Sequence, residues 1–199
     1  MFSPTCPRML EALLVSALVV AVGELGDKTQ LLTLVLAARY RKPWPIIAGI
    51  LVATLANHTV AAALGQWVRD AVAPDILRWG LALSFFAVAA WALKPDQFDA
   101  SDAPPVSDRN VFAVTLVAFF LAEIGDKTQI ATAMLAAKFD HLFAVVAGTT
   151  LGMLLVDAPT AFLGDAAAKR IPFRAVRISA AALFAGLGAW VLVAPRFGA

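Results

Sequence analysis

One six-residue pattern, Glu-x-Gly-Asp-Lys-Thr, occurs twice in this chain, each time inside a stretch that is otherwise apolar. The first copy spans residues 24–29 and the second spans residues 123–128. A charge is costly in the hydrocarbon of a bilayer, so an ionisable residue within a membrane helix usually has a function. The chain must therefore fold so that four carboxylates and two lysines are sheltered from lipid. Their placement indicates a pathway for cations.

The composition is that of an integral membrane protein. Of the 199 residues, 61% are hydrophobic and 15% are charged, and the mean hydropathy is +0.80, whereas soluble domains carry roughly 25% charged residues. The net charge of +2 and the lack of a basic patch interleaved with aromatic residues give no reason to expect a nucleic-acid partner. The single cysteine, Cys6, allows no internal disulfide, and no cysteine–histidine spacing typical of a metal site is present.

The two halves of the chain are related by a duplication. A shift of 99 residues aligns them without a gap over nearly the whole of each half. The aligned pairs include Glu24 with Glu123, Asp27 with Asp126, Gln30 with Gln129, Thr33 with Thr132, Arg78 with Arg177 and Trp91 with Trp190. We predict a first repeat over residues 1–94, a flexible linker rich in proline and acidic residues over residues 95–110, and a second repeat over residues 111–199.

Each half contains three apolar runs that are long enough to cross a bilayer. A hydrocarbon core of about 30 Å takes roughly 20 helical residues. The first run of each half is long for one span, so we expect it either to tilt or to break near Gly26 and Gly125. The fold class predicted is an all-α integral membrane protein with six transmembrane helices, at about 10–38, 45–65, 77–94, 111–137, 142–164 and 175–194.

An odd number of spans in each repeat has a geometric consequence. The second repeat must enter the membrane from the side opposite to the first, so the two three-helix repeats are predicted to be inverted. Inverted repeats related by a two-fold axis in the membrane plane recur in secondary transporters, which bind their substrates at the repeat interface near the bilayer midplane.

Loop lysines and arginines predict the orientation, because cytoplasmic loops carry an excess of them. One side of the predicted bundle collects nine of these residues and the other collects five. The richer side has Arg39, Arg41, Lys42, Lys94, Arg109, Lys169, Arg170, Arg174 and Arg177, and the poorer side has Arg8, Arg69, Arg78, Lys138 and Arg196. We predict a multi-pass protein of the cell inner membrane with both termini outside and the linker in the cytoplasm.

The acidic residues of each copy are spaced to share one face of a helix. Glu24 and Asp27 are three residues apart, as are Glu123 and Asp126, and residues at this spacing are neighbours on a helix. Gln30 and Gln129 extend the two faces by three more residues. Two-fold symmetry would bring the faces together, so we predict one metal site whose ligands are Glu24, Asp27, Gln30, Glu123, Asp126 and Gln129.

Ligands of this kind favour a hard divalent cation. Oxygen atoms suit Ca²⁺, Mg²⁺ and Mn²⁺, whereas zinc or copper sites would normally include histidine or cysteine. The glutamates, aspartates and lysines of the two copies carry a net charge of −2, which one divalent cation would neutralise. Protons could neutralise the same carboxylates in its absence, and this competition is a physical basis for cation/proton exchange.

Four other ionisable residues are candidates for accessory roles. Lys28 follows Glu24 by four residues, the favourable order for an ion pair on one helix, and Lys127 follows Glu123 in the same way. We expect each lysine to hold a carboxylate in place while the site is empty. His58 and Asp157, which the 99-residue shift aligns, are candidate proton carriers or partners in a hydrogen bond between helices.

The doubled pattern, with three predicted spans per copy, closely resembles the Gdt-type family of cation/proton exchangers, which includes bacterial manganese exporters of the MneA type. The resemblance covers essentially all six predicted spans. It implies export of Mn²⁺ in exchange for protons, with Ca²⁺ as a second substrate. It also implies that Glu24, Asp27, Glu123 and Asp126 bind the metal, and it leaves the roles of His58 and Asp157 open.

The leading hypothesis is therefore a secondary transporter, not an enzyme. Its substrates would be a divalent cation and protons, it would work in a lipid bilayer, and it would need no resident cofactor. A Ca²⁺/H⁺ antiporter on the same carboxylates is the nearest alternative. An intramembrane metal-dependent hydrolase could use these carboxylates too, but a symmetric duplication favours alternating access over a one-sided active site. The inverted repeat also argues against a passive channel, and the sequence does not indicate an oligomeric state.

Overall fold

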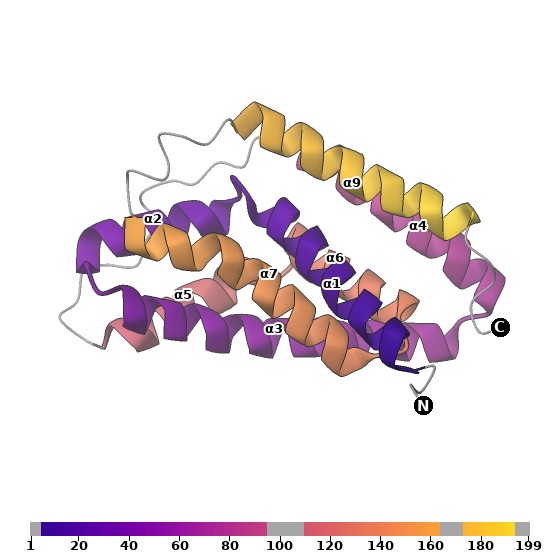
Figure 1. The fold of residues 1–199 in the computed structure, drawn as a ribbon, viewed down its shortest axis with the longest axis horizontal. Coiled ribbons are helices and arrows are strands. Elements are labelled where there is room, and N and C mark those ends of the chain that lie inside the picture. Colours follow the sequence, from indigo (N-terminus) through magenta and orange to yellow (C-terminus); the bar gives the residue numbers. More distant parts are fainter. Residues whose placement is uncertain (1–4, 95–109, 164–172, 194–199) are drawn as a thin grey trace.

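The computed structural model describes residues 5–94, 110–163 and 173–193, and within these ranges every regular element is a helix (Figure 1). The predicted all-helical class is confirmed. The helices are α1 (Thr5–Glu24), α2 (Lys28–Tyr40), α3 (Pro43–Ala71), α4 (Pro74–Ala92), α5 (Val111–Glu123), α6 (Lys127–Lys138), α7 (Leu142–Leu163) and α9 (Phe173–Val193). The 99-residue shift pairs α1 with α5, α2 with α6, α3 with α7 and α4 with α9.

The first apolar run of each half is broken rather than tilted. Gly26 and Gly125 both have a φ of +76°, a left-handed conformation that glycine adopts far more readily than other residues. The break between α1 and α2 turns the chain by 70°. The same break separates α5 from α6. The doubled motif therefore encodes a helix interruption in each half, one of the two outcomes expected from the length of these runs.

The helices confirm a chain that spans the membrane several times. Four of them are long and apolar enough to cross a bilayer, namely Pro43–Ala71, Pro74–Ala92, Leu142–Leu163 and Arg174–Val193. The bent pair α1–α2 brings the number to five if it forms one span. Helix α5 has 13 residues and is short for a crossing. The sixth span, α5 together with α6, stays a prediction.

Most of the predicted linker, residues 95–109, lies outside the described residues, and so do Arg109, Lys169, Arg170 and Arg196 of the charge count. The last linker residue, Asn110, is described and begins the second half. Its side-chain oxygen accepts a hydrogen bond of 3.1 Å from the backbone N–H of Phe112. Asn110 therefore caps the N-terminus of α5, a position at which asparagine is strongly preferred.

The largest helix contacts join the two halves of the chain. Helix α3 packs on α5 and α6, and its mate α7 packs on α1 and α2, while α4 packs along α9. Contacts inside one half, such as α3 with α4, are much smaller. The halves are therefore interlocked, and each supplies the packing partners of the other.

Two glycines make the same close contact at equivalent places. Gly49 of α3 lies against α5, where an added Cβ would come within 2.7 Å of the Thr115 Cβ. Gly148 of α7 lies against α1, where an added Cβ would come within 2.9 Å of the Ser16 Cβ. Both the glycines and their partners are 99 residues apart. Small residues let membrane helices approach closely, so the two main interfaces between the halves share one packing device.

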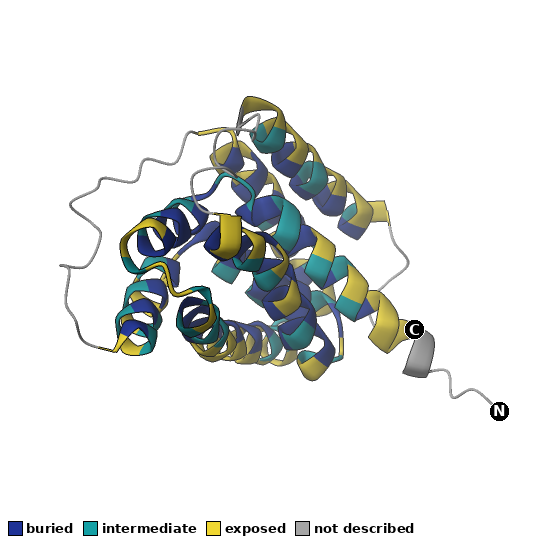
Figure 2. Cartoon of the chain, turned by 60° about the vertical axis from the view of Figure 1, so that its left-hand side comes forward, coloured by how far each residue is buried: buried dark blue, intermediate teal, exposed yellow. Residues whose placement is uncertain are grey.

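Burial divides each helix into an inner and an outer face. Figure 2 shows buried residues on the faces that helices turn toward each other and exposed residues on the outside of the bundle. Large apolar side chains are exposed there, among them Leu14, Leu83 and Phe143. Extended exposed apolar surface marks contact with a partner or a membrane. In this bundle it suits contact with lipid.

Alanine at Gly49 or Gly148 should lower the melting temperature of the purified protein in detergent. The added methyl group would collide with the opposing helix, and overpacking of a tight contact typically costs about 1–3 kcal/mol. Gly80 and Gly186 provide matched controls, since a Cβ at either position would meet nothing within 4 Å. There alanine should leave melting unchanged or raise it. Equal melting temperatures for all four variants would contradict the packing role of Gly49 and Gly148.

Candidate metal centre

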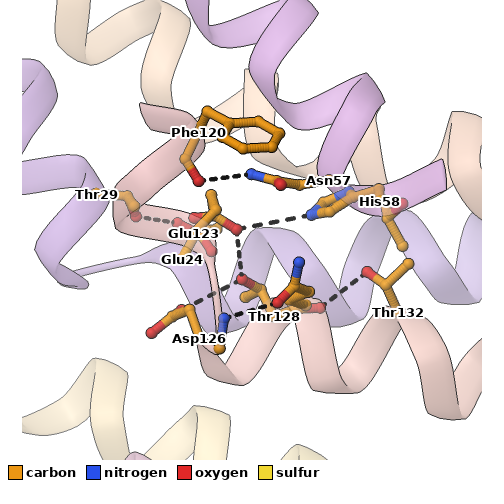
Figure 3. Close-up of polar contacts among 12 residues, drawn as sticks. Glu24, Thr29, Asn57, His58, Phe120, Glu123, Asp126, Thr128 and Thr132 are labelled. Atoms are coloured by element: carbon orange, nitrogen blue, oxygen red, sulfur yellow. Dashed lines mark hydrogen bonds and ion pairs between the residues drawn. The ribbon is translucent and has the colours of Figure 1, made fainter. Parts of the chain in front are cut away.

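Three carboxylates from the two halves come together at the helix breaks. One carboxylate oxygen from each of Glu24, Asp27 and Asp126 lies within 4.8 Å of the other two. All three side chains are buried, with exposed fractions of 0%, 1% and 3%. Figure 3 shows Glu24, Glu123 and Asp126 gathered where the two halves meet. Such a group of buried oxygen ligands can hold a divalent cation.

The break, not a continuous helix face, brings glutamate and aspartate together. Glu24 ends α1, and Asp27 is the extended residue before α2, with its N–H donating to the carbonyl oxygen of Glu24 at 3.0 Å. Asp126 donates in the same way to Glu123 at 3.1 Å. Within the described residues, neither aspartate side chain caps its own helix. The spacing predicted that the two residues of each copy share one face of a helix, whereas in the structure a break separates them.

The glutamines that follow the two copies of the motif form hydrogen bonds at the helix breaks. The side-chain oxygen of Gln30 accepts a 2.7 Å hydrogen bond from the N–H of Gly26, and Gln129 accepts one of 2.7 Å from Gly125. Gln30 also donates to the Thr160 hydroxyl of α7 at 3.2 Å. Each glutamine thus satisfies a backbone donor that the interruption of the helix leaves without its usual partner. Ligation of the metal by Gln30 and Gln129 stays a prediction.

The lysines pair across the halves. The Lys127 ammonium lies 2.5 Å from an oxygen of Asp27, and the Lys28 ammonium lies 3.5 Å from an oxygen of Asp126. These pairs differ from those that the spacing predicted, Lys28 with Glu24 and Lys127 with Glu123, because each break separates glutamate and lysine into different helices. The crossed pairs instead tie each aspartate to the opposite half.

The two glutamates of the motif have different surroundings. The Thr29 hydroxyl donates to Glu24 at 2.5 Å, and Glu24 belongs to the three-carboxylate group. Glu123 lies outside that group, although it is equally buried. It accepts a hydrogen bond of 3.3 Å from Thr128 and lies 3.8 Å from the Nε2 atom of His58 (Figure 3). The repeats therefore present equivalent residues in unequal positions.

The predicted accessory residues His58 and Asp157 are both fully buried. His58 of α3 lies beside Glu123. Asp157 of α7 accepts a hydrogen bond of 2.6 Å from the Thr33 hydroxyl. This bond fits the alternative of a bond between helices, and the role of either residue in moving protons stays a prediction.

Sequence reasoning did not single out the threonines that surround the carboxylates. Thr29 and Thr128 bond the glutamates of their own copy, and Thr160 bonds Gln30. The signal was present for Thr29 and Thr128, because both close the repeated six-residue pattern. Thr160 carried no such signal, since the shift aligns it with an alanine, Ala61.

Several buried acceptors at the site have no hydrogen-bond partner among the described residues. They are one oxygen each of Glu24, Glu123 and Asp157. A buried polar atom without a partner is rare and marks a place where an ion, a proton or a water molecule can bind. The donor set therefore fits a cation.

A family described as the divalent cation/proton antiporter GDT1 matches residues 12–100 and 111–198. A protein of Vibrio cholerae named "Putative manganese exporter" is 50% identical over 182 residues, which cover 90% of each chain. A GDT1-like protein of Synechocystis is 29% identical over 195 residues, covering 88% of this chain and 94% of its own. GDT1-like protein 3 of Arabidopsis thaliana is 25% identical, covering 92% and 70%. No solved structure matches significantly.

The family match covers both halves of the chain, including both copies of the repeated motif. The resemblance stated from the doubled motif is confirmed, and the hydrolase considered above is excluded. The chain belongs to the GDT1 family of divalent cation/proton antiporters, so it is a multi-pass membrane transporter of divalent cations and not an enzyme.

Proposed function

We propose that this protein exports Mn²⁺ from the cytoplasm in exchange for protons. The observation that carries the proposal is the buried group formed by Glu24, Asp27 and Asp126, in which both halves of the chain contribute to one centre. The description of the family supports exchange with protons. The name of the Vibrio relative, which shares half of its residues with this chain, supports manganese as the metal.

The proposed ligands are the carboxylates of Glu24, Asp27 and Asp126, completed by Glu123. Oxygen ligands suit Mn²⁺. The side-chain oxygens of Gln30 and Gln129 already accept a hydrogen bond from the backbone at each break. Each oxygen has a second lone pair, through which it would bind the metal. Ca²⁺ uses the same ligand types, so Ca²⁺/H⁺ exchange on this centre is the second candidate.

The lysines can balance the negative charge of the centre when no metal is bound. Lys127 and Lys28 occupy, at Asp27 and Asp126, positions that an entering cation has to take. Leaving several buried carboxylates without counter-charges would be strongly unfavourable. We infer that metal entry displaces the ammonium groups and that they return when the metal leaves, so the centre is never left without positive charge.

The proposed architecture is six spans in two inverted repeats, residues 1–94 and 111–199, joined by the linker. In it, α1–α2 and α5–α6 are the broken crossings of the two repeats. The exchange of partners between halves, α3 with α5 and α7 with α1, fits this arrangement. The metal centre would then lie between the repeats near the bilayer midplane, with both termini outside and the linker in the cytoplasm.

Replacing a ligand without changing its size should abolish export. We expect Glu24→Gln and Asp126→Asn to remove manganese tolerance from cells that depend on this protein and to weaken Mn²⁺ binding by the purified protein at least about tenfold. Loss of an outer-shell partner alone typically costs that much. Tolerance is measured by growth in added Mn²⁺, and binding by titration calorimetry.

The controls are carboxylates of the same chain that lie outside the centre. Glu11→Gln changes an exposed residue of α1, and Asp140→Asn changes a side chain that is 78% exposed. Both should keep wild-type tolerance. Normal tolerance in Glu24→Gln and Asp126→Asn, with protein present in the membrane, would refute the proposed centre.

Transport by purified protein in sealed proteoliposomes should depend on an imposed pH gradient. Metal should move against the direction of proton flow, and collapsing the gradient with a proton ionophore should remove the accelerated component. A passive channel would instead give a flux that the gradient does not change. Competition by Ca²⁺ and Mg²⁺ in the same vesicles decides the metal, since Mn²⁺ flux that Ca²⁺ suppresses at equal concentration would favour the calcium candidate.

A reporter fused after Ala199 should be located outside the cytoplasm, and one inserted into the linker should be located inside it. Alkaline phosphatase, active only outside, and a fluorescent protein that folds only inside provide opposite signals. An alkaline phosphatase fused at Ala199 that is inactive while the fluorescent protein there is bright would reverse the proposed orientation.

A further inference from the structure

The α4–α9 pair is placed unequally over the two halves. Helix α4 packs on α6, and α9 packs on α1. The equivalent contacts under the 99-residue shift, α9 on α2 and α4 on α5, are marginal by comparison. Figure 1 shows α4 and α9 side by side over α6 and α1, away from α2 and α5. The shift exchanges α4 with α9, so the pair has an equivalent placement over α2 and α5 that the structure does not show.

One end of the pair is fastened to the end of α6 by an aromatic cluster. The Lys138 ammonium lies 4.6 Å from the centre of the Trp190 ring. The ring of Phe139 lies 6.3 Å from the same tryptophan ring, tilted by 42°. Cation–π and aromatic contacts of this kind are attractive but individually weak. We call these three residues the Trp190 latch.

The same kinds of side chain recur at the equivalent positions of the first half. The shift places Arg39 on Lys138, Tyr40 on Phe139 and Trp91 on Trp190. Each position keeps its chemistry: a cation, an aromatic ring and a tryptophan. We call this second set the Trp91 latch.

The aromatic contact of the Trp91 latch, between Tyr40 and Trp91, is not made in the structure. Tyr40 makes no aromatic contact within the described part of the chain, and its hydroxyl group is buried without a hydrogen-bond partner there. The end of α2 is also uncovered: Ala38 is exposed, whereas its equivalent Ala137 is only 2% exposed.

We propose that the two latches close alternately, so that the α4–α9 pair swings between the end of α6 and the end of α2 and covers one end of the path to the metal centre at a time. The inference rests on the proposed transport function. In the proposed topology the ends of α2 and α6 face opposite sides of the membrane. The structure then corresponds to the state closed toward the outside and open toward the cytoplasm, in which metal for export would load.

Two equivalent placements of one packed pair are what such a switch requires. Packed interfaces move between discrete arrangements rather than deforming continuously. Because the two latches contain the same kinds of side chain, their contacts should have similar energies. Because each contact is weak, either latch can open. A small bias from bound metal or protons can then shift the population.

Cross-linking tests the unobserved placement directly. In a Cys6→Ser background, which removes the only native thiol, Phe139→Cys/Trp190→Cys should form a disulfide under oxidation. Tyr40→Cys/Trp91→Cys should form one as well, and each cross-link should stop Mn²⁺ flux in proteoliposomes until it is reduced. Failure of the Tyr40–Trp91 pair to cross-link, in protein that transports Mn²⁺, would overturn the proposal.

Cysteine accessibility provides a second test that does not depend on transport. With reporters Ala38→Cys and Ala137→Cys, a polar maleimide should label position 38 faster than position 137. Trp190→Ala should speed labelling at 137 and slow it at 38, and the matched variant Trp91→Ala should not speed labelling at 137. Unchanged rates in Trp190→Ala, or faster labelling at both positions, would refute the latch.

The two tests separate the latch from the proposed function. If Glu24→Gln abolishes Mn²⁺ binding but the labelling rates never respond to latch variants, the proposed metal centre is supported and the latch is refuted. If the latch variants change the labelling rates while the carboxylate variants keep full manganese tolerance, the switch is supported and the proposed function is refuted.

Discussion

The arrangement of the charged groups in the metal centre depends on two glycines, Gly26 and Gly125, whose left-handed backbone conformation interrupts a helix in each half. At Gly26 and Gly125 the helix stops and restarts, so a glutamate ends one helix and an aspartate immediately precedes the next. A helix N-terminus favours nearby negative charge, which suits Asp27 and Asp126. A glutamine four residues beyond each glycine accepts the bond that the interrupted helix lacks. The break thereby satisfies its own backbone while the aspartate side chains turn toward the other half.

The charges of the centre are balanced across the two halves rather than within either. Asp27 faces Lys127, and Asp126 faces Lys28. Burying an acidic group without a partner is strongly unfavourable, so the crossed pairs make assembly of the halves a condition for burying the motif. The balance is unequal, because Lys127 is buried while a third of the Lys28 side chain is exposed. Two copies of one sequence motif thus occupy two distinct environments.

Sequence sufficed for the features that depend on local pattern. The duplication, the membrane-spanning helical class and the family could all be predicted from the sequence, and a break at Gly26 and Gly125 was one of the two outcomes expected for the long first runs. The lysine pairs could not be predicted, since spacing rules for a continuous helix assign Lys28 to Glu24, and the break sends it elsewhere. The separation of Glu123 from the three-carboxylate group could not be predicted either, because the 99-residue shift makes Glu24 and Glu123 equivalent in sequence and only the fold gives them different surroundings. A repeated pattern cannot indicate which of its two copies will have which surroundings.

The exchange of packing partners between halves bears on how the chain is made. Helix α3 needs α5 and α6, which are synthesised later, so its inner face has no partner when the first half leaves the ribosome. Gly49, which meets the backbone of α5, and the polar residues Asn57 and His58 would be left facing lipid or a chaperone during that interval. Chains generally fold from the N-terminus as they emerge, yet in this one the inner face of α3 stays unpacked until α5 and α6 have been synthesised. Substitutions on the inner face of α3 can therefore be costly during biogenesis as well as in the final folded protein.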